Sequence, residues 1–335
     1  MTFDVLDETT LARLGNIDVW GSVYWDEPYN SEGSFTLEVR PTEENLSLLR
    51  EGRWLVRTDA AVKIPMRICH RSNENEDANL VVTGYPATWI YTKRVSISAI
   101  KNENAEAAML ALAKAAKPWP RLEVAEPKGF DTKFENQTSG AALFDYFKTV
   151  GSACDLGFRV VLTGKNSAKK LLFEVWRPTA DPNNRFSPRW GSLREASWAF
   201  GDGSYANVAL VLGAGEGKDR AMVWAGDTAA EGAQRREMII DARDIQPEDG
   251  ETVKSDSYLK KLADRGASKL LEQLRTGSIE MTLDADGLEP GDVCFCSLPD
   301  LGYKATVRVA DIIIQSQTDG TTRTARLGTP VWHKI

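Results

Sequence analysis

The sequence contains very little histidine. Only His70 and His333 are present among 335 residues, and the H-E-x-x-H pattern of zinc proteases is absent. A serine or cysteine triad needs a histidine as its general base, and a zinc hydrolase needs two or three as ligands. We expect His70, at the end of a predicted strand, to lie on the surface, and His333 is close to the C-terminus, where order is least assured. The sequence therefore offers no histidine-based catalytic site.

Cysteine is also scarce, with four residues in the chain. Cys69 and Cys154 are isolated in the sequence, whereas Cys294 and Cys296 lie two apart in "GDVCFCSL". That spacing places both thiols on the same face of one strand. It matches neither a C-x-x-C motif nor a zinc finger, so we expect buried free thiols and no metal site.

Long apolar runs and an excess of basic residues are both absent. No apolar stretch approaches the roughly 18 residues of a membrane-spanning helix, and the net charge of −7 excludes a general nucleic-acid-binding surface. The N-terminal stretch "MTFDVLDETTLARLG" is acidic and lacks the apolar segment of a signal peptide. The 42% hydrophobic and 27% charged residues are ordinary for a soluble globular protein. We therefore expect the chain to be made and assembled in a cytoplasm.

One glycine-rich stretch, "NVALVLGAGEGKDR" at residues 207–220, looks at first like a phosphate-binding loop. The dinucleotide pattern G-x-G-x-x-G fails because Lys218 occupies the third glycine position. The ATP-binding pattern fails because Leu212 stands at its first glycine and Asp219 at its Ser/Thr position. The stretch instead predicts strand, turn and strand, with glycines supplying positive φ at a hairpin tip. No cofactor is expected.

The first hundred residues favour β-structure. In "GSFTLEVRP" the apolar residues Phe35, Leu37 and Val39 alternate with polar ones, which predicts a strand with one buried face. The chain contains ten tryptophans, several of them in this region. Clustered tryptophans can form a sugar-binding platform, but in strand-like runs we expect them mainly in the core or at interfaces.

Helical patterns begin after residue 100. "NENAEAAMLALAKAAKPWP" predicts a helix that has acids in its first turn and ends before Pro118. A second helix is predicted from Ser139, with its apolar stripe formed by Leu143, Phe144, Phe147 and Val150. The runs "GFRVVLT" and "LLFEVWRP" predict a hairpin, and residues 178–191 a loop or a domain boundary.

The C-terminal half contains a charged segment and a long helix. The segment "QRREMIIDARDI" contains five charged residues: Arg235, Arg236, Asp241, Arg243 and Asp244. These charges could form an active cluster, but we favour a solvated or intersubunit salt network. "KSDSYLKKLADRGASKLLEQLRTG" predicts a helix at 255–276, capped by Ser255 or Asp256 and stopped by Gly277. Its apolar stripe consists of Leu259, Leu262, Leu270 and Leu274.

Two stretches share a layout that suggests an internal repeat. The first reads "GRWLVRT", "MRICH", a polar turn and "NLVVTGYP"; the second reads "GDVCFCS", "TVRVADIIIQ", a polar turn and "TTRTARLGTP". Each begins at a glycine, Gly52 or Gly291, and ends with Gly-x-Pro. If the repeat is real, the chain contains two copies of one small β-barrel, and three chains in a ring would present six similar modules.

An ordered set of segments carries a resemblance to a known family. They are "LGNIDVWGSVYWDEPYNSEGSFTLEVRP", "GRWLVRTD", "NVALVLGAGEGKDR", "RREMIIDARDI", "YLKKLADRGASKLLE", "GDVCFCS" and "ARLGTP". On these segments the chain resembles tail-tip proteins of long-tailed phages and prophages, related to baseplate hub and tail-associated proteins. The resemblance spans nearly the whole chain.

The resemblance implies a β-rich α+β fold with two related small β-barrel domains and α/β segments between them. We accordingly predict a first barrel-like hub domain at 1–100, a helix-containing α/β domain at 101–190, and a second barrel-like hub domain at 191–335 that includes helix 255–276. It also implies a homotrimeric ring below the tail tube in the virion tail tip. The implied partners are the distal tail protein, the tail tube, the tape-measure protein and receptor-binding fibres, with DNA only in transit.

No catalytic, cofactor-binding or metal-binding residue is assigned, and we expect a structural protein rather than an enzyme. Two other classes stay open. A host-wall carbohydrate-binding module predicts exposed, coplanar tryptophans in a groove. A tail-associated cell-wall hydrolase predicts a cleft with two carboxylates about 5 to 10 Å apart, although some relatives carry such activity in a C-terminal extension that this sequence, which stops at Ile335, does not contain.

Overall fold

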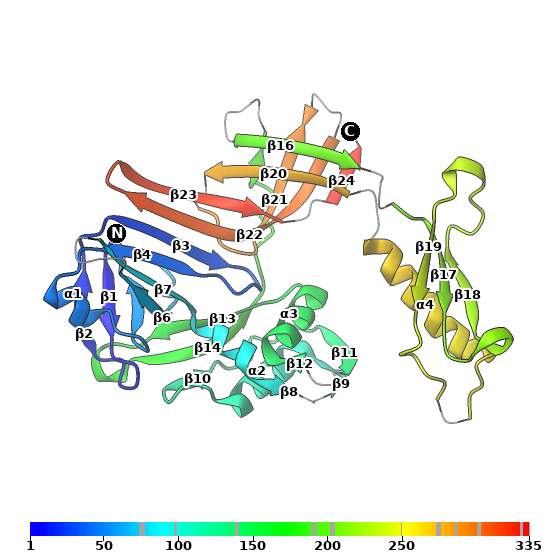
Figure 1. The fold of residues 1–335 in the computed structure, drawn as a ribbon, viewed down its shortest axis with the longest axis horizontal. Helices are drawn as coiled ribbons and strands as arrows, with labels where there is room; N and C mark the ends of the chain where they lie inside the picture. Colours follow the sequence, from blue (N-terminus) through cyan, green and yellow to red (C-terminus); the bar gives the residue numbers. More distant parts are fainter. Residues whose placement is uncertain are drawn as a thin grey trace. The chain divides into compact units, whose positions relative to one another are not determined.

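The fold is β-rich α+β and consists of several sheets (Figure 1). A computed structural model describes residues 1–335 except 74–77, 97–98, 138–140, 188, 190–192, 202–204, 249, 273–275, 285–286, 300–302, 329–330 and 335. The chain divides into two compact units. The first unit contains Met1–Ala196 and Glu280–Ile335, and the second contains Ser197–Ile279.

A 14-stranded sheet dominates the first unit, and its strands follow the order β16-β20-β23-β22-β3-β4-β7-β6-β5-β1-β2. Strands β21 and β24 pair with β22, and the short β15 pairs with β21. Their bounds are β1 Phe3–Leu6, β2 Arg13–Ile17, β3 Ser22–Pro28, β4 Phe35–Val39, β5 Trp54–Arg57, β6 Met66–Ser72, β7 Leu80–Pro86, β15 Arg185–Phe186, β16 Leu193–Gly201, β20 Thr276–Asp284, β21 Val293–Leu298, β22 Tyr303–Gln317, β23 Gly320–Leu327 and β24 Val331–Lys334.

The alternating pattern of the N-terminal strands fixes which face is buried. Phe35, Leu37 and Val39 of β4 are buried while the residues between them are half-buried, which confirms the predicted strand. The short helix α1 (Glu43–Leu48) follows, capped by the Thr42 side chain, which accepts a hydrogen bond from the Asn45 N–H. Since the side-chain period of a strand is two, one residue of slippage would turn this apolar face toward solvent.

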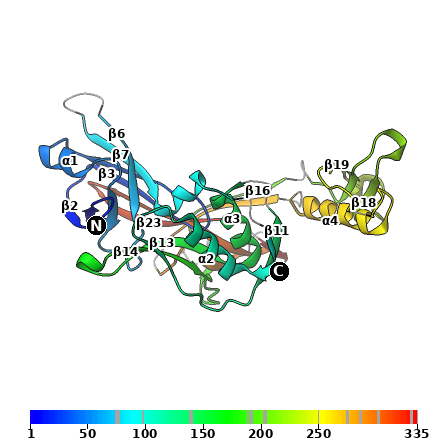
Figure 2. The ribbon, with the colours of Figure 1, turned by 90° about the horizontal axis from the view of Figure 1, so that it is seen from below.

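A second core lies under two helices of the first unit. Helices α2 (Ala105–Ala116) and α3 (Leu143–Cys154) lie side by side next to β13 (Gly157–Thr163) and β14 (Lys170–Trp176), as Figure 2 shows. The hairpin β13–β14 and the helix that ends before Pro118 are both confirmed. The apolar stripe of α3 is buried in an aromatic cluster, in which the Phe144 ring packs edge-on against Phe158.

The start of α3 differs from the sequence prediction. The helix begins at Leu143 and not at Ser139, because β12 (Ala141–Ala142) pairs with β8 (Val95–Ser96) immediately before it. Residues 138–140 lie outside the described part. The remaining elements of this region are β9 (Ala99–Asn104), β10 (Leu122–Val124), β11 (Lys133–Gln137) and the 3-10 turns η1 (Ala87–Lys93) and η2 (Asn166–Ala168).

Between β16 and β20, the described residues of the second unit form a three-stranded sheet and helix α4 (Asp256–Glu272). The sheet order is β18-β17-β19, with β17 Val208–Leu212, β18 Met222–Gly226 and β19 Glu237–Asp241. Helix α4 packs on one face of this sheet, and the 3-10 turns η4 (Gly217–Asp219) and η5 (Gly232–Gln234) lie between the strands. The prediction that this helix runs to residue 276 and stops at Gly277 is wrong: Gly277 belongs to strand β20, so sheet pairing takes precedence over the glycine stop signal.

The two stretches of the suspected repeat share backbone details. Strands β5, β6 and β7 pair in sequence, as do β21, β22 and β23. A register shift occurs in the second ladder of each stretch, β6–β7 and β22–β23. Gly52 and Gly291 have φ of 91° and 93°. Each accepts a hydrogen bond on its carbonyl oxygen from an arginine of the second strand of its stretch, Arg67 on β6 or Arg308 on β22.

The shared layout does not extend to two barrels. No closed barrel is found among the described residues, and the strands of both stretches belong to one large sheet. The coarser prediction, a β-rich α+β fold with several sheets, is confirmed. The division into domains at 1–100, 101–190 and 191–335 stays a prediction.

Candidate interaction surface

The central strand of the second unit is apolar along its whole length. In β17 every residue from Val208 to Leu212 is aliphatic, and such a run is typical of a strand covered on both faces. Helix α4 covers one face: Leu262 and Leu270 pack against Ala209 and Val211. Gly266 permits this close approach, since a Cβ there would lie 2.7 Å from the side chains of Ala225 and Val211.

The opposite face of the same sheet is exposed. By register, Leu210 lies between Trp224 on β18 and Ile239 on β19, and Leu212 lies next to Met222. Met222, Trp224 and Ile239 are 57%, 44% and 71% exposed, and the two leucines are half-buried. We call these five residues the apolar panel. Because burying aliphatic and aromatic surface is favourable, the panel is suited to a contact with another protein surface.

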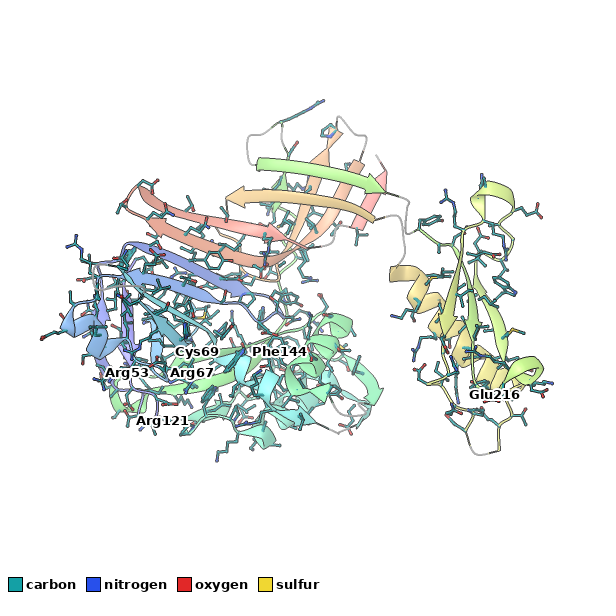
Figure 3. All side chains as sticks on the ribbon, viewed as in Figure 1. Arg53, Arg67, Cys69, Arg121, Phe144 and Glu216 are labelled. Carbon is teal, nitrogen blue, oxygen red and sulfur yellow. The ribbon has the colours of Figure 1, made fainter. Side chains whose placement is uncertain are left out.

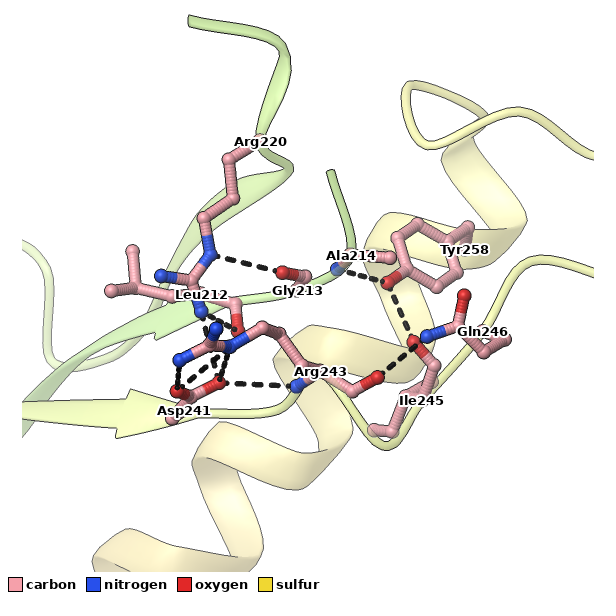
Figure 4. A network of polar contacts seen from close by, with 9 residues as sticks. All are labelled: Leu212, Gly213, Ala214, Arg220, Asp241, Arg243, Ile245, Gln246 and Tyr258. Atoms are coloured by element: carbon pink, nitrogen blue, oxygen red, sulfur yellow. Dashed lines mark hydrogen bonds and ion pairs between the residues drawn. The ribbon is translucent and has the colours of Figure 1, made fainter. Parts of the chain in front are cut away.

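Charged residues border the panel, and they are paired within the chain (Figure 4). Arg220 and Arg243 both bind Asp241, at 2.9 and 2.5 Å. Hydrogen bonds from Arg243 hold the pKa of the Asp241 carboxyl down at about 2. Arg235 binds Glu237 and lies over the Trp224 ring. These pairs, together with the one between Arg265 and Asp244, confirm the predicted salt network.

The glycine-rich stretch is confirmed as strand, turn and strand. Gly215 and Gly217 have positive φ, as predicted, and Glu216 lies at the tip of this hairpin in Figure 3. Gly213 instead serves packing, since a Cβ there would lie 2.6 Å from a methyl of Leu262. The Ala214 N–H donates to the Tyr258 hydroxyl (Figure 4), so part of the loop backbone is already engaged by the chain's own side chains.

A buried acidic pair lies elsewhere, in the large sheet of the first unit. Asp26 on β3 and Asp311 on β22 are 7% and 2% exposed. The Arg326 Nε lies 2.6 Å from Asp311 Oδ2, whereas Asp26 Oδ1 has no hydrogen-bond partner among the described residues. Burial and then the Asp311 charge raise the pKa of Asp26 to about 7. Sequence reasoning missed this pair, because its members lie at opposite ends of the chain.

A cavity of about 360 Å³ in the first unit has a lining with balanced charge. Its lining includes Glu27, Asp59, Glu289, Arg57, Arg159 and Arg323. Arg57 binds Glu27 and Asp59, and Arg159 binds Glu174 and lies over Trp176. Because these six residues comprise three acids and three arginines, their net charge favours neither an anionic nor a cationic ligand.

The structure places the cysteines, a histidine and several tryptophans that the sequence analysis named. Cys294 and Cys296 are buried on β21, and burial raises the pKa of both thiols to about 12. His70 is exposed on β6, and the side chain of His333 lies outside the described part. Among the tryptophans whose side chains are described, Trp25, Trp54 and Trp119 are buried. Within the described residues no group of three or more metal-ligating side chains is found, nor a helix long and apolar enough to cross a membrane.

The fold is similar to those of solved phage and prophage tail proteins. The 43 kDa tail protein of prophage MuSo2 from Shewanella oneidensis matches with a TM-score of 0.63 at 12% identity, covering 98% of both chains. A tail protein from Neisseria meningitidis MC58 matches with a TM-score of 0.58 at 13% identity, over 97% of this chain and 96% of that one. Prophage tail protein gp18 from Listeria monocytogenes EGD-e gives 0.54 at 12% identity, over 97% and 94%.

The sequence itself places the chain in a family. Residues 2–329 match the family described as Siphovirus ReqiPepy6 Gp37-like protein, and the chain belongs to that family. None of the curated proteins matches.

Proposed function

We propose that the chain is a structural component of the tail tip or baseplate hub of a phage or prophage-derived particle. Three copies form a ring below the tail tube and link the tube and distal tail protein to the host-contacting tip. The observation that carries this proposal is family membership over residues 2–329. Further support comes from a fold likeness to a chain described as part of the "p2 virion baseplate in activated conformation", with a TM-score of 0.54 over 97% of this chain.

The chemistry of the second unit agrees with assembly into a larger particle. Apolar residues on an open sheet face, bordered by arginines that are already paired, resemble the composition of protein–protein contacts. The ring lies in the virion tail, with the tape-measure protein and receptor-binding fibres as neighbours. The particle is assembled in the host cytoplasm. DNA passes through the ring only in transit.

The ring is tested directly by electron microscopy and mass measurement of the purified chain. We expect a threefold ring and a mass three times that of the 37.0 kDa chain. A different closed symmetry, such as a twofold dimer, contradicts the proposal. If the purified chain is a monomer, it does not assemble by itself. The same measurement is then repeated with the distal tail protein added, and a threefold ring is expected.

The alternative of a cell-wall hydrolase has its own test. We expect no clearing on a zymogram of host cell wall, because the chain is proposed to be structural and the described acidic pair lies inside a sheet ladder rather than in a cleft. Clearing by the purified chain would overturn the structural assignment. A carbohydrate-binding module is less well supported, since three of the described tryptophans are in the core.

A further inference from the structure

The two ends of the chain meet at one ladder of the large sheet. The sheet path passes from the C-terminal strands to the N-terminal strands where β22 pairs with β3, and the two strands lie next to each other in Figure 1. Their register places Asp26 opposite Ile313 and Asp311 opposite Pro28. Asp26 and Asp311 are therefore diagonal neighbours on the same face, within reach of each other.

The position of Asp311 is set by an irregularity in its strand. The ladder between β22 and β23 shifts register between Val309 and Asp311. Such bulges change the direction of a side chain and are frequent beside functional positions. Asp311 is held by Arg326 from β23, and the Ser31 hydroxyl lies at 3.5 Å from its other oxygen. One cation is thus present for two buried carboxyls.

The groups that act on Asp26 come from three strands. Burial and the neighbouring Asp311 carboxyl both oppose ionisation of Asp26. A hydrogen bond between the two carboxyls requires that one of them carries a proton. Arg326 on β23 favours ionisation of Asp26. Tyr24 lies on the same face of β3 as Asp26, and its hydroxyl is neutral at physiological pH, because burial raises the already high pKa of Tyr24 further. Glu27 also opposes ionisation of Asp26, but it points to the other face of β3 and is bound there by Arg57.

We propose that Asp26 and Asp311 form a proton-dependent latch between β3 and β22. With one proton shared, the carboxyls hydrogen-bond across the ladder and hold the C-terminal strands on the N-terminal strands. When this proton leaves to solvent, two buried carboxylates with one arginine between them repel, and the ladder opens locally. The latch acts within the chain and does not depend on the proposed function.

Hydrogen–deuterium exchange of the full chain tests the latch, with labelling times scaled to the intrinsic amide rate at each pH. A carboxyl with a pKa near 7 in the closed ladder and an ordinary 3.8 in the open one makes opening about twentyfold more favourable at pH 7.5 than at pH 5.5. We expect that loss of protection in peptides covering β3 and β22. Peptides covering β13 and β14 serve as the internal reference and stay protected.

Two variants and one control variant separate the latch from general stability. Asp26→Asn keeps the shape of the protonated carboxyl and removes the pH dependence, whereas Asp319→Asn, at an exposed position in the β22–β23 turn, behaves like the natural chain. Arg326→Gln removes the cation and moves the transition to higher pH. Equal protection at both pH values, or an unchanged pH dependence in Asp26→Asn, would overturn the proposal. If Asp26→Asn does not fold, the natural chain and Arg326→Gln decide the matter.

Discussion

Replacing Gly84 by alanine is expected to lower the free energy of unfolding of the first unit by about 3 kcal/mol or more. Gly84 lies in β7 between Phe35 of β4 and Ile68 of β6. A Cβ at this position would lie 1.8 Å from the Arg67 carbonyl oxygen and 2.7 Å from the Phe35 ring. Because the nearer atom belongs to backbone in a paired strand, the clash cannot be relieved by a side-chain rotation. Urea denaturation followed by tryptophan fluorescence measures the loss.

The matched control is Gly328→Ala, at the corresponding glycine of the second stretch. There a Cβ would lie 3.5 Å from the Arg308 carbonyl oxygen, which is an ordinary contact, so a change within about 0.5 kcal/mol is expected. If both variants lost stability equally, or if Gly84→Ala were neutral, the steric argument would be wrong. The comparison also measures how far the two stretches differ, since their Gly-x-Pro endings look the same in the sequence.

Strands and helices with strong periodicity could be predicted from the sequence alone. The alternation of Phe35, Leu37 and Val39 and the stripe of Leu143, Phe144, Phe147 and Val150 each specify a face, and the structure buries those faces. The glycines of residues 207–220 were correctly assigned to a hairpin, because failed motif positions are visible in a sequence. The ends of elements are less predictable. In the sequence Gly277 looks like the residue that ends a helix, but in the structure it belongs to strand β20.

The parts that could not be predicted depend on contacts between distant residues. Nothing near Asp26 or Asp311 in the sequence indicates that they meet, since the β3–β22 ladder forms only when the whole sheet assembles. The apolar panel was equally hidden. Met222 and Trp224 lie in the apolar run of β18, and Ile239 lies beside Ile240 in β19, so the sequence does not distinguish the two faces. Only the position of α4 shows which face is left open.

Glu106→Ala is expected to cost the first unit about 3 to 5 kcal/mol. The Glu106 side chain is in the first turn of α2 and is 1% exposed. Its carboxylate accepts hydrogen bonds from three successive backbone N–H groups, those of Lys128 at 2.6 Å, Gly129 at 2.9 Å and Phe130 at 3.0 Å. Truncation leaves these donors without a partner and removes a negative charge from the positive end of the helix dipole. Urea denaturation measures the cost.

The sequence showed only that acidic residues occupy the first turn of this helix, which by itself is worth a few tenths of a kcal/mol to about one. The size of the measured loss therefore distinguishes a dipole effect from a carboxylate that organises the 128–130 loop. Glu126→Ala, at an exposed position in the same segment, should change stability by about 0.5 kcal/mol at most. In Glu106→Ala the amides of 128–130 should also lose protection from hydrogen exchange. A loss below about 1 kcal/mol with those amides still protected would mean that water replaces the carboxylate at little cost.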